Sequence, residues 1–227
     1  MKHFKKVLLL TPTHMEMQCV GLSLQDSGQD VGHGFECAVC GFGPVSTAVF
    51  LAQRFSRSDY DMILLMGLAG AYSGSQVQVG DICVAESEVY ADLGRCVGNV
   101  IEPIEIVEET TSLRFDLLTY WNASLFGCIE DVVVETGAKM VDMATVCCVS
   151  CNQERAMSIA MRWGVAAENM EGAAAAQVCA VYGIPFLEVR AVSNWAGDCD
   201  KTRWRIQPAL ARLRDFILCF IRRLNAV

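Results

Sequence analysis

The side chains best suited to chemistry in this sequence are two carboxylates, Glu16 and Glu171, and one amide, Asn194. Glu16 lies just past an apolar run. A carboxylate partly withdrawn from water there has a raised pKa, which suits it to accept a proton from an attacking water. Glu171 begins an alanine-rich run and could accept two hydrogen bonds from a cis-diol such as ribose. Each glutamate could also be a first-turn residue that complements a helix dipole.

Asn194 follows another apolar run, and a buried amide needs partners for both its oxygen and its nitrogen. A purine edge offers such a pair if the oxygen accepts from a protonated N7 and the nitrogen donates to a 6-oxo group. The flipped amide would match a 6-aminopurine, so the residue indicates a purine more than one particular base. A turn with Gly197 is the structural alternative.

A second constellation is similar to the ligand set of zinc nucleoside deaminases. His14 and Glu16 form an H-x-E pair, and Cys37 and Cys40 form a C-x-x-C pair. The proline expected before the first cysteine is Glu36, and the cysteine pair falls inside a predicted strand rather than at a helix start. We therefore expect no metal and no other cofactor, and a zinc deaminase stays the alternative from another class.

Two glycine-rich segments, 41–46 and 67–74, carry no Lys or Arg that could pair with a phosphate. The first segment ends in Ser46, where a dinucleotide-binding turn needs its third glycine. The chain also lacks the G-x-x-x-x-G-K-[ST] and G-x-S-x-G motifs. A phosphate co-substrate is therefore not expected.

The composition indicates one globular domain. The chain has 227 residues, 53% of them hydrophobic, and a net charge of −8, so it can bury a sizeable core and is expected to form one domain over residues 1–227. The negative charge disfavours nucleic acid as a partner, and no apolar run is long enough to span a membrane. Four aliphatic residues after the first lysines are too few for a signal-peptide core. We therefore expect a cytoplasmic protein whose cysteines are mostly reduced.

Apolar β-rich runs alternate with helical patterns, which predicts an α/β layered fold with a largely parallel sheet. The strands are predicted at Val7–Thr11, Phe35–Cys40, Asp61–Met66, Asp81–Tyr90, Val132–Glu135, Lys139–Ser150, Val165–Glu168 and Pro185–Ser193. The helices are predicted at Pro44–Phe55, Gln153–Trp163, Glu171–Tyr182 and Gln207–Leu224. Ligands of such folds gather beyond the carboxyl ends of the strands, where the candidate residues lie.

Over nearly its whole length the chain resembles the superfamily of purine nucleoside phosphorylases and nucleosidases. Within it the chain is most similar to the futalosine hydrolases, and it is also similar to the 5'-methylthioadenosine/S-adenosylhomocysteine nucleosidases. The matching segments are VLLLTPTHMEM, CGFGPVSTA, MGLAGAYSGSQVQVGDICVAES, YADLG, ENMEGAAAAQVCAVYGIPFLEVRAVSN and GDCDKTRW. The resemblance implies a phosphorylase/hydrolase-like, three-layer αβα fold with a central twisted mixed sheet. It also implies a homodimer in which the partner completes each site.

The resemblance also implies roles for the catalytic candidates. Glu16 falls where the water-activating carboxylate lies, Glu171 where a carboxylate binds the ribose hydroxyls, and Met170 where a Met packs on the ribose. Asn194 takes the place of an Asp that protonates N7 in the methylthioadenosine nucleosidases. It is the residue type that the futalosine hydrolases and the 6-oxopurine phosphorylases carry here.

Four further residues are expected in the substrate pocket by the same resemblance. They are Ala69 and Gly70 in the second glycine-rich segment, Val149 in the cysteine-rich segment, and Asn169, which replaces a Glu common in the nucleosidases.

The expected activity is hydrolysis of a purine nucleoside. By resemblance the substrate is futalosine, giving hypoxanthine and dehypoxanthine futalosine on a route to menaquinone. The alternative within the class is an adenine-releasing nucleosidase that acts on aminodeoxyfutalosine, methylthioadenosine or S-adenosylhomocysteine. A non-catalytic nucleoside-binding protein is a further alternative.

Overall fold

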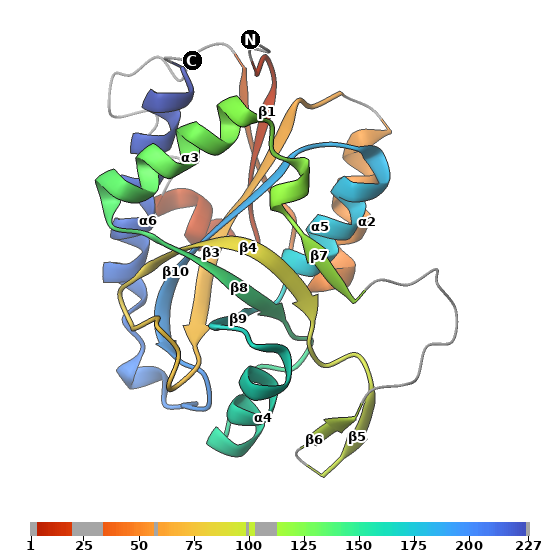
Figure 1. The fold of residues 1–227 in the computed structure, drawn as a ribbon, viewed down its shortest axis with the longest axis vertical. Coiled ribbons are helices and arrows are strands. Elements are labelled where there is room, and N and C mark those ends of the chain that lie inside the picture. Colours follow the sequence, from red (N-terminus) through yellow and green to blue (C-terminus); the bar gives the residue numbers. More distant parts are fainter. Residues whose placement is uncertain (1–3, 20–33, 57–58, 99, 103–112, 226–227) are drawn as a thin grey trace.

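The computed structural model describes residues 4–19, 34–56, 59–98, 100–102 and 113–225, and it shows an α/β molecule built on one mixed sheet (Figure 1). The strands of this sheet are β1 (Val7–Thr11), β2 (Phe35–Val39), β3 (Met62–Ala71), β4 (Ile82–Tyr90), β7 (Arg114–Asp116), β8 (Lys139–Thr145), β9 (Ala167–Asn169) and β10 (Phe186–Trp195). A separate small sheet pairs β5 (Arg95–Val97) with β6 (Val100–Glu102).

The main sheet curls back on itself. Its order is β10-β4-β8-β9-β3-β1-β2, and β3 pairs with β10 as well. Strand β3 runs parallel to β1 and β10 and antiparallel to β9. Gly70 of β3 is therefore paired on one side with Glu168 and on the other with Asn194, so residues distant in sequence meet at one end of the sheet.

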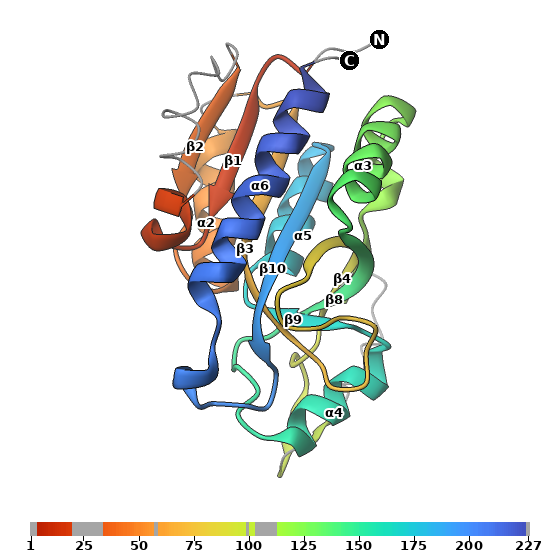
Figure 2. The same ribbon diagram turned by 90° about the vertical axis from the view of Figure 1, so that its left-hand side faces the viewer.

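Helices cover both faces of the sheet, as the three-layer fold predicts (Figure 2). Helices α2 (Pro44–Phe55) and α5 (Gly172–Tyr182) contact each other on one face, and α3 (Ala123–Thr136) and α6 (Ile206–Leu224) contact each other on the opposite face. Helix α4 (Gln153–Trp163) lies at one end of the molecule, and the short 3-10 helices are η1 (Leu118–Tyr120) and η2 (Lys201–Arg203). The layered α/β fold is confirmed.

The amphipathic pattern of the last helix is confirmed. Its apolar stripe is buried against the sheet and α3, and its arginines lie on the outer side. Local signals also set other helix ends: α2 begins with Pro44 after Gly43, whose φ of 85° is left-handed, and α5 ends at Gly183, whose φ is 66°.

The predicted strand Val132–Glu135 is wrong, because these residues belong to helix α3. Three consecutive valines favour a strand locally, yet burial follows a helical spacing at Leu125, Cys128, Ile129 and Val132. Asn122 caps the helix by accepting a hydrogen bond from Leu125 N at 2.9 Å. Tertiary packing therefore decides against the local strand propensity.

Two other strand boundaries differ from the prediction. Strand β3 continues to Ala71, so the glycine-rich segment after Met66 is largely strand and not a turn. It stays extended because β10 pairs with it as far as Trp195. Strand β8 ends at Thr145 instead of Ser150. No helix within the described residues is long and apolar enough to cross a membrane.

Candidate active site

A cavity of about 480 Å³ lies where the carboxyl ends of β1, β3 and β10 meet. All eight residues predicted for the site line it. They come from distant parts of the chain, and the curled sheet brings them together.

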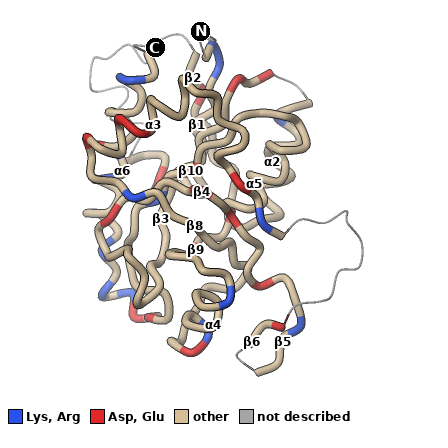
Figure 3. Tube along the Cα trace, in the orientation of Figure 1, with Lys and Arg blue, Asp and Glu red and all other residues tan. Residues whose placement is uncertain are grey.

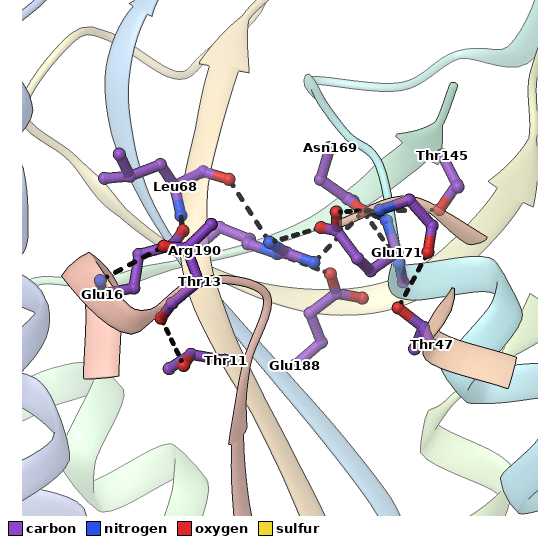
Figure 4. A network of polar contacts seen from close by, with 12 residues as sticks. Thr11, Thr13, Glu16, Thr47, Leu68, Thr145, Asn169, Glu171, Glu188 and Arg190 are labelled. Atoms are coloured by element: carbon purple, nitrogen blue, oxygen red, sulfur yellow. Dashed lines mark hydrogen bonds and ion pairs between the residues drawn. The ribbon is translucent and has the colours of Figure 1, made fainter. Parts of the chain in front are cut away.

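Glu16 lies in a short helical stretch directly after β1, and its carboxylate is buried at the cavity (Figure 4). The Thr13 hydroxyl donates to Oε2 at 2.5 Å, and the Leu68 main-chain N–H donates to Oε1 at 3.0 Å. Burial raises the pKa of Glu16, against the opposing effects of the Thr13 hydrogen bond and the positive charge of Arg190. The side chain is thus an oriented carboxylate with enhanced basicity.

Glu171 lies across Arg190 from Glu16 in the same network (Figure 4). Its Oε1 accepts a hydrogen bond from Gly43 N at 3.0 Å, and its Oε2 is 3.2 Å from Arg190 Nη1. The main chain at Gly43, where φ is 85°, aims its N–H at the carboxylate. Glu171 is the N-cap residue of α5, yet its side chain makes no cap hydrogen bond. The purely helix-capping alternative for this carboxylate therefore finds no support.

Arg190 is a site residue that sequence reasoning missed. It is 1% exposed and lies between Glu16 and Glu171. Burial opposes its charge, but the carboxylates of Glu188 and Glu171 outweigh burial and raise the pKa of the guanidinium. The available signal was an arginine inside an otherwise apolar strand, a position that needs buried acidic partners.

Asn169 organises the start of α5. Its Oδ1 accepts hydrogen bonds from Glu171 N at 2.9 Å and Gly172 N at 2.8 Å, and its Nδ2 donates to Glu88 Oε1 at 2.5 Å. The amide therefore fixes the main chain that carries Glu171.

Glu88, which accepts from Asn169, and Glu188, which accepts from Arg190, form a fully buried pair of carboxyl groups. Glu188 Oε1 accepts from Arg190 Nε at 2.8 Å, whereas Glu188 Oε2 has no hydrogen-bond partner other than the facing carboxyl of Glu88. Burial raises the pKa of both groups, and mutual repulsion raises the pKa of Glu88 further. A side chain at Gly172 would collide with both carboxyls. One shared proton satisfies this geometry.

Asn194 lies beside Gly70, beyond Arg190 on β10, and lines the same cavity. Its Oδ1 accepts from Ser193 Oγ at 2.7 Å, and its Nδ2 donates to Trp195 O at 3.1 Å. The alternative of a turn with Gly197 is wrong, because the Gly197 N–H donates to Ser150 O. A Cβ atom at Gly70 would be 3.2 Å from Asn194 Nδ2, so glycine keeps this wall open.

The remaining predicted residues contribute apolar side chains and main-chain atoms to the wall of the cavity. Ala69 precedes Gly70 on β3, Met170 is half-buried beside Glu171, and Val149 lies in the segment after β8. Glu168, which sequence reasoning named without a role, lines the cavity as well.

Most of the cysteines form no disulfide, which agrees with the prediction that they are mostly reduced. The exception is a disulfide between Cys151 and Cys199, with a Cα–Cα distance of 5.1 Å. Both half-cystines line the cavity. They meet because the segments after β8 and β10 converge, with the Gly197 N–H donating to Ser150 O at 2.8 Å. Sequence spacing alone cannot reveal such a pairing.

Zinc ligands are not brought together in the part of the chain that the structure describes. No group of three or more His, Cys, Asp or Glu side chains there is placed to hold a metal ion. Cys37 on β2 is exposed, whereas Cys40, just after the end of that strand, is buried.

The comparisons with known proteins agree with this geometry. The family model of the phosphorylase superfamily matches residues 31–222. A futalosine hydrolase of Thermus thermophilus is 36% identical over 189 residues, covering 80% of this chain and 79% of that protein. A 5'-methylthioadenosine/S-adenosylhomocysteine nucleosidase of Mycobacterium bovis is 28% identical over 213 residues, covering 79% of this chain and 77% of that protein.

A solved structure of a futalosine hydrolase mutant of Helicobacter pylori has the same fold. It superposes with a TM-score of 0.79 at 19% identity, covering 96% of this chain and 99% of that chain. Together with the sheet order and the cavity, these matches show that the chain belongs to the phosphorylase superfamily.

Proposed function

We propose that this protein hydrolyses the N-glycosidic bond of futalosine, releasing hypoxanthine and dehypoxanthine futalosine. The observation that carries the proposal is the placement of Glu16 and Glu171 on either side of Arg190, in a cavity that Asn194 also lines. The similarity to a futalosine hydrolase supports this substrate. By resemblance the reaction would serve menaquinone synthesis.

Glu16 would act as the general base. Its buried carboxylate takes a proton from a water, which attacks C1' of the ribose as the bond to the purine breaks. The ribose gains positive charge in this transition state, and the carboxylates of Glu16 and Glu171 stabilise that charge electrostatically. Replacing Glu16 by Gln keeps its shape and removes the base, so turnover should fall by about 10²–10⁴-fold.

Glu171 would bind the ribose hydroxyls through its carboxylate. Arg190 and the Gly43 N–H hold that carboxylate from behind, and Asn169 holds its main chain. Met170 would pack on the ribose. Sugar binding therefore depends on a carboxylate whose position is fixed before substrate arrives.

Asn194 would stabilise the departing purine. Its amide would hydrogen-bond to N7 and to the 6-oxo group while the base lies over Ala69 and Gly70. Val149 would contribute to the opposite wall. An amide cannot supply a proton, so the proton that the departing base carries on N7 would come from water, and the amide oxygen would accept a hydrogen bond from that N7–H.

Hydrolysis is favoured over phosphorolysis by the state of Arg190. Its guanidinium is already engaged by Glu188, Glu171, Leu68 O and Asn169. A guanidinium so occupied cannot also bind phosphate bidentately. Water, not phosphate, is therefore the proposed nucleophile.

The direct test incubates the purified protein with futalosine, aminodeoxyfutalosine, methylthioadenosine and inosine, with and without phosphate, and identifies the released base by chromatography. Hypoxanthine from futalosine, at a rate that phosphate does not change, is expected. The Glu16→Gln protein is the matched control. Adenine alone would assign the protein to the adenine-releasing alternative, and no free base at all would favour a deaminase or a non-catalytic binder.

A homodimer is proposed as the working unit. Phe42, Val45 and Val49 expose apolar side chains around the start of α2. Phe42 also lines the cavity, so a second copy on this face would close the site. Light scattering should give twice the monomer mass.

The cytoplasm is the proposed location. Ten of the twelve cysteines are free, as is usual in a reducing compartment, and this supports the assignment. Fractionation of the native cell would test it.

A further inference from the structure

We infer that Glu168 selects the base by accepting a hydrogen bond from the N1–H group of a 6-oxopurine. This inference rests on the proposed function and adds a specificity-determining residue to the same site. The similarity to the phosphorylase superfamily assigns no role to Glu168. Asn194, the other polar residue proposed to contact the purine, can serve either kind of base.

The register of the sheet places Glu168 at the base-binding end. Gly70 pairs with Glu168 of β9 on one side and with Asn194 of β10 on the other. Neighbouring strands lie about 4.8 Å apart, so the two Cα atoms are separated by roughly 10 Å with a glycine between them. Both residues line the cavity. A planar base lying over Gly70 would thus meet Asn194 at one edge and Glu168 at another.

The hydrogen bonds of Glu168 leave room for one more donor. Oε2 accepts from Ser150 Oγ at 2.7 Å and from Tyr72 OH at 2.9 Å, which uses both of its lone pairs. Oε1 accepts from Ser150 N at 2.9 Å and has no second partner among the described residues. All three neighbours donate, so the carboxyl acts as an acceptor, and it is 3% exposed. Glu168 therefore offers a buried acceptor with an unused lone pair, and it is one of the residues that line the cavity.

This acceptor distinguishes the two classes of purine at the atom where they differ. A 6-oxopurine carries a proton on N1 and donates it, whereas a 6-aminopurine presents a lone pair at N1. A carboxylate oxygen attracts the first and repels the second. Asn194 can flip its amide to suit either base, but an ionised carboxylate cannot become a donor. Glu168 is therefore the residue that distinguishes 6-oxopurines from 6-aminopurines.

The competing explanation is that Glu168 only anchors the segment at Ser150. Two variants separate the explanations. Glu168→Gln keeps the shape and replaces the acceptor by an amide that can donate to N1. Tyr72→Phe removes one donor to Glu168 and leaves the carboxylate in place, so it is the matched control for lost anchoring.

The experiment measures kcat/KM for futalosine and aminodeoxyfutalosine, which share a 5' substituent and differ at the base. In Glu168→Gln the ratio of 6-oxo to 6-amino activity should fall by about 10-fold to 100-fold. In Tyr72→Phe both activities should change together. A folded Glu168→Gln protein, judged by its circular dichroism and melting temperature, that loses both activities equally would overturn the inference.

A measurement on the unmodified protein guards against a variant that does not fold. 1-Methylinosine lacks the N1 proton, so it should be cleaved at least about 10-fold more slowly than inosine. Equal cleavage would reject the assignment. If the unmodified protein releases no base from any of these compounds, the proposed function itself fails, and the inference fails with it. Release of hypoxanthine with an unchanged ratio in Glu168→Gln would reject the inference alone.

Discussion

The chemistry of Glu16 depends on two opposing influences that the structure separates. Burial makes the carboxylate more basic, while the Thr13 hydroxyl stabilises its charged form. The net effect raises the pKa of Glu16 above its usual value near 4.5. Only the ionised form can accept a proton from water. Activity should therefore be lost as pH falls through a value higher than that of an ordinary glutamate.

Thr13→Ala should move the acid limb of the pH–activity profile, where activity is lost as pH falls, to higher pH. Without the hydroxyl the carboxylate loses a hydrogen bond to its charged form, so the pKa of Glu16 should rise further. The measurement is kcat/KM for futalosine as a function of pH. Thr13→Ser retains the hydroxyl and should keep the original limb. An unchanged limb in Thr13→Ala would remove Glu16 from the role of base.

Asn194→Asp should shift activity toward adenine nucleosides. The new carboxyl oxygen would face Trp195 O, which now accepts from the amide at 3.1 Å. Two acceptors in contact repel unless one carries a proton, so the pKa of the new carboxyl should rise. A protonated Asp could then donate to N7 of an adenine leaving group.

The check is the ratio of kcat/KM for aminodeoxyfutalosine to that for futalosine, which should increase about 10-fold or more. Ser193→Ala is a useful comparison, because it removes the hydroxyl that holds Asn194 without introducing an acid. An unchanged ratio in Asn194→Asp would mean that a missing acid at position 194 is not what limits the departure of an adenine.

At the scale of the elements, the disulfide joins two segments that form one wall of the cavity. It links the segment before α4 to the segment after β10, which lie 48 residues apart in sequence. A crosslink over a loop of this length restricts the unfolded chain and stabilises the fold by about 2–4 kcal/mol.

A Cys151→Ser, Cys199→Ser double variant should therefore unfold at lower urea concentration than the parent. Its midpoint should also be insensitive to a thiol reductant, whereas the reductant should lower the midpoint of the parent. Cys37→Ser, which changes an exposed free cysteine, is the control and should behave like the parent. If reductant leaves the parent unchanged, the bond makes no contribution in solution.

The elements that sequence reasoning predicted are those with strong local signals. Pro44 and Gly183 mark helix ends through backbone preferences that hold in any context. Helix α3 escaped prediction because its valines favour a strand and only packing against α6 favours a helix. The glycine-rich end of β3 escaped because its extended state depends on pairing with β10.

The site residues, too, could be predicted only where the sequence signal is local. Glu16, Glu171 and Asn194 could be named from the sequence because their chemistry and their places after strands are both local. Arg190 could not be assigned, because its role depends on Glu171, which lies outside β10 and is brought near only by the fold. Its other partner, Glu188, is two residues away on the same strand. The Cys151–Cys199 pairing is non-local for the same reason.

On the scale of the whole molecule, the interior near the site is acidic. Among the described residues, the buried charged side chains are five glutamates and one arginine, namely Glu16, Glu88, Glu168, Glu171, Glu188 and Arg190. The other Lys and Arg in the described ranges lie nearer the surface, with several along α6 (Figure 3). An excess of buried carboxyls suits a substrate that becomes cationic, but it costs stability when those carboxyls ionise.

The direction of the pKa shifts shows that this stability is lost as pH rises. Burial raises the pKa values of Glu16, Glu88, Glu168 and Glu188 in the folded protein. The folded state therefore binds these protons more tightly than the unfolded chain. Their contribution to the free energy of unfolding is full below the ordinary value near 4.5 and is lost as pH rises through the folded values, at about 1.4 kcal/mol for each unit of pKa difference.

Glu188→Gln should reduce this loss. The new amide can accept from Arg190 Nε and donate to Glu88, so the pair no longer needs a shared proton. The free energy of unfolding, measured with urea at pH 5.5, 7 and 8.5, should fall less with rising pH in Glu188→Gln than in the parent protein. Glu130→Gln, on the exposed side of α3, should keep the parental fall. A Glu188→Gln protein with the full parental fall would show that the buried pair is not the source of the pH dependence.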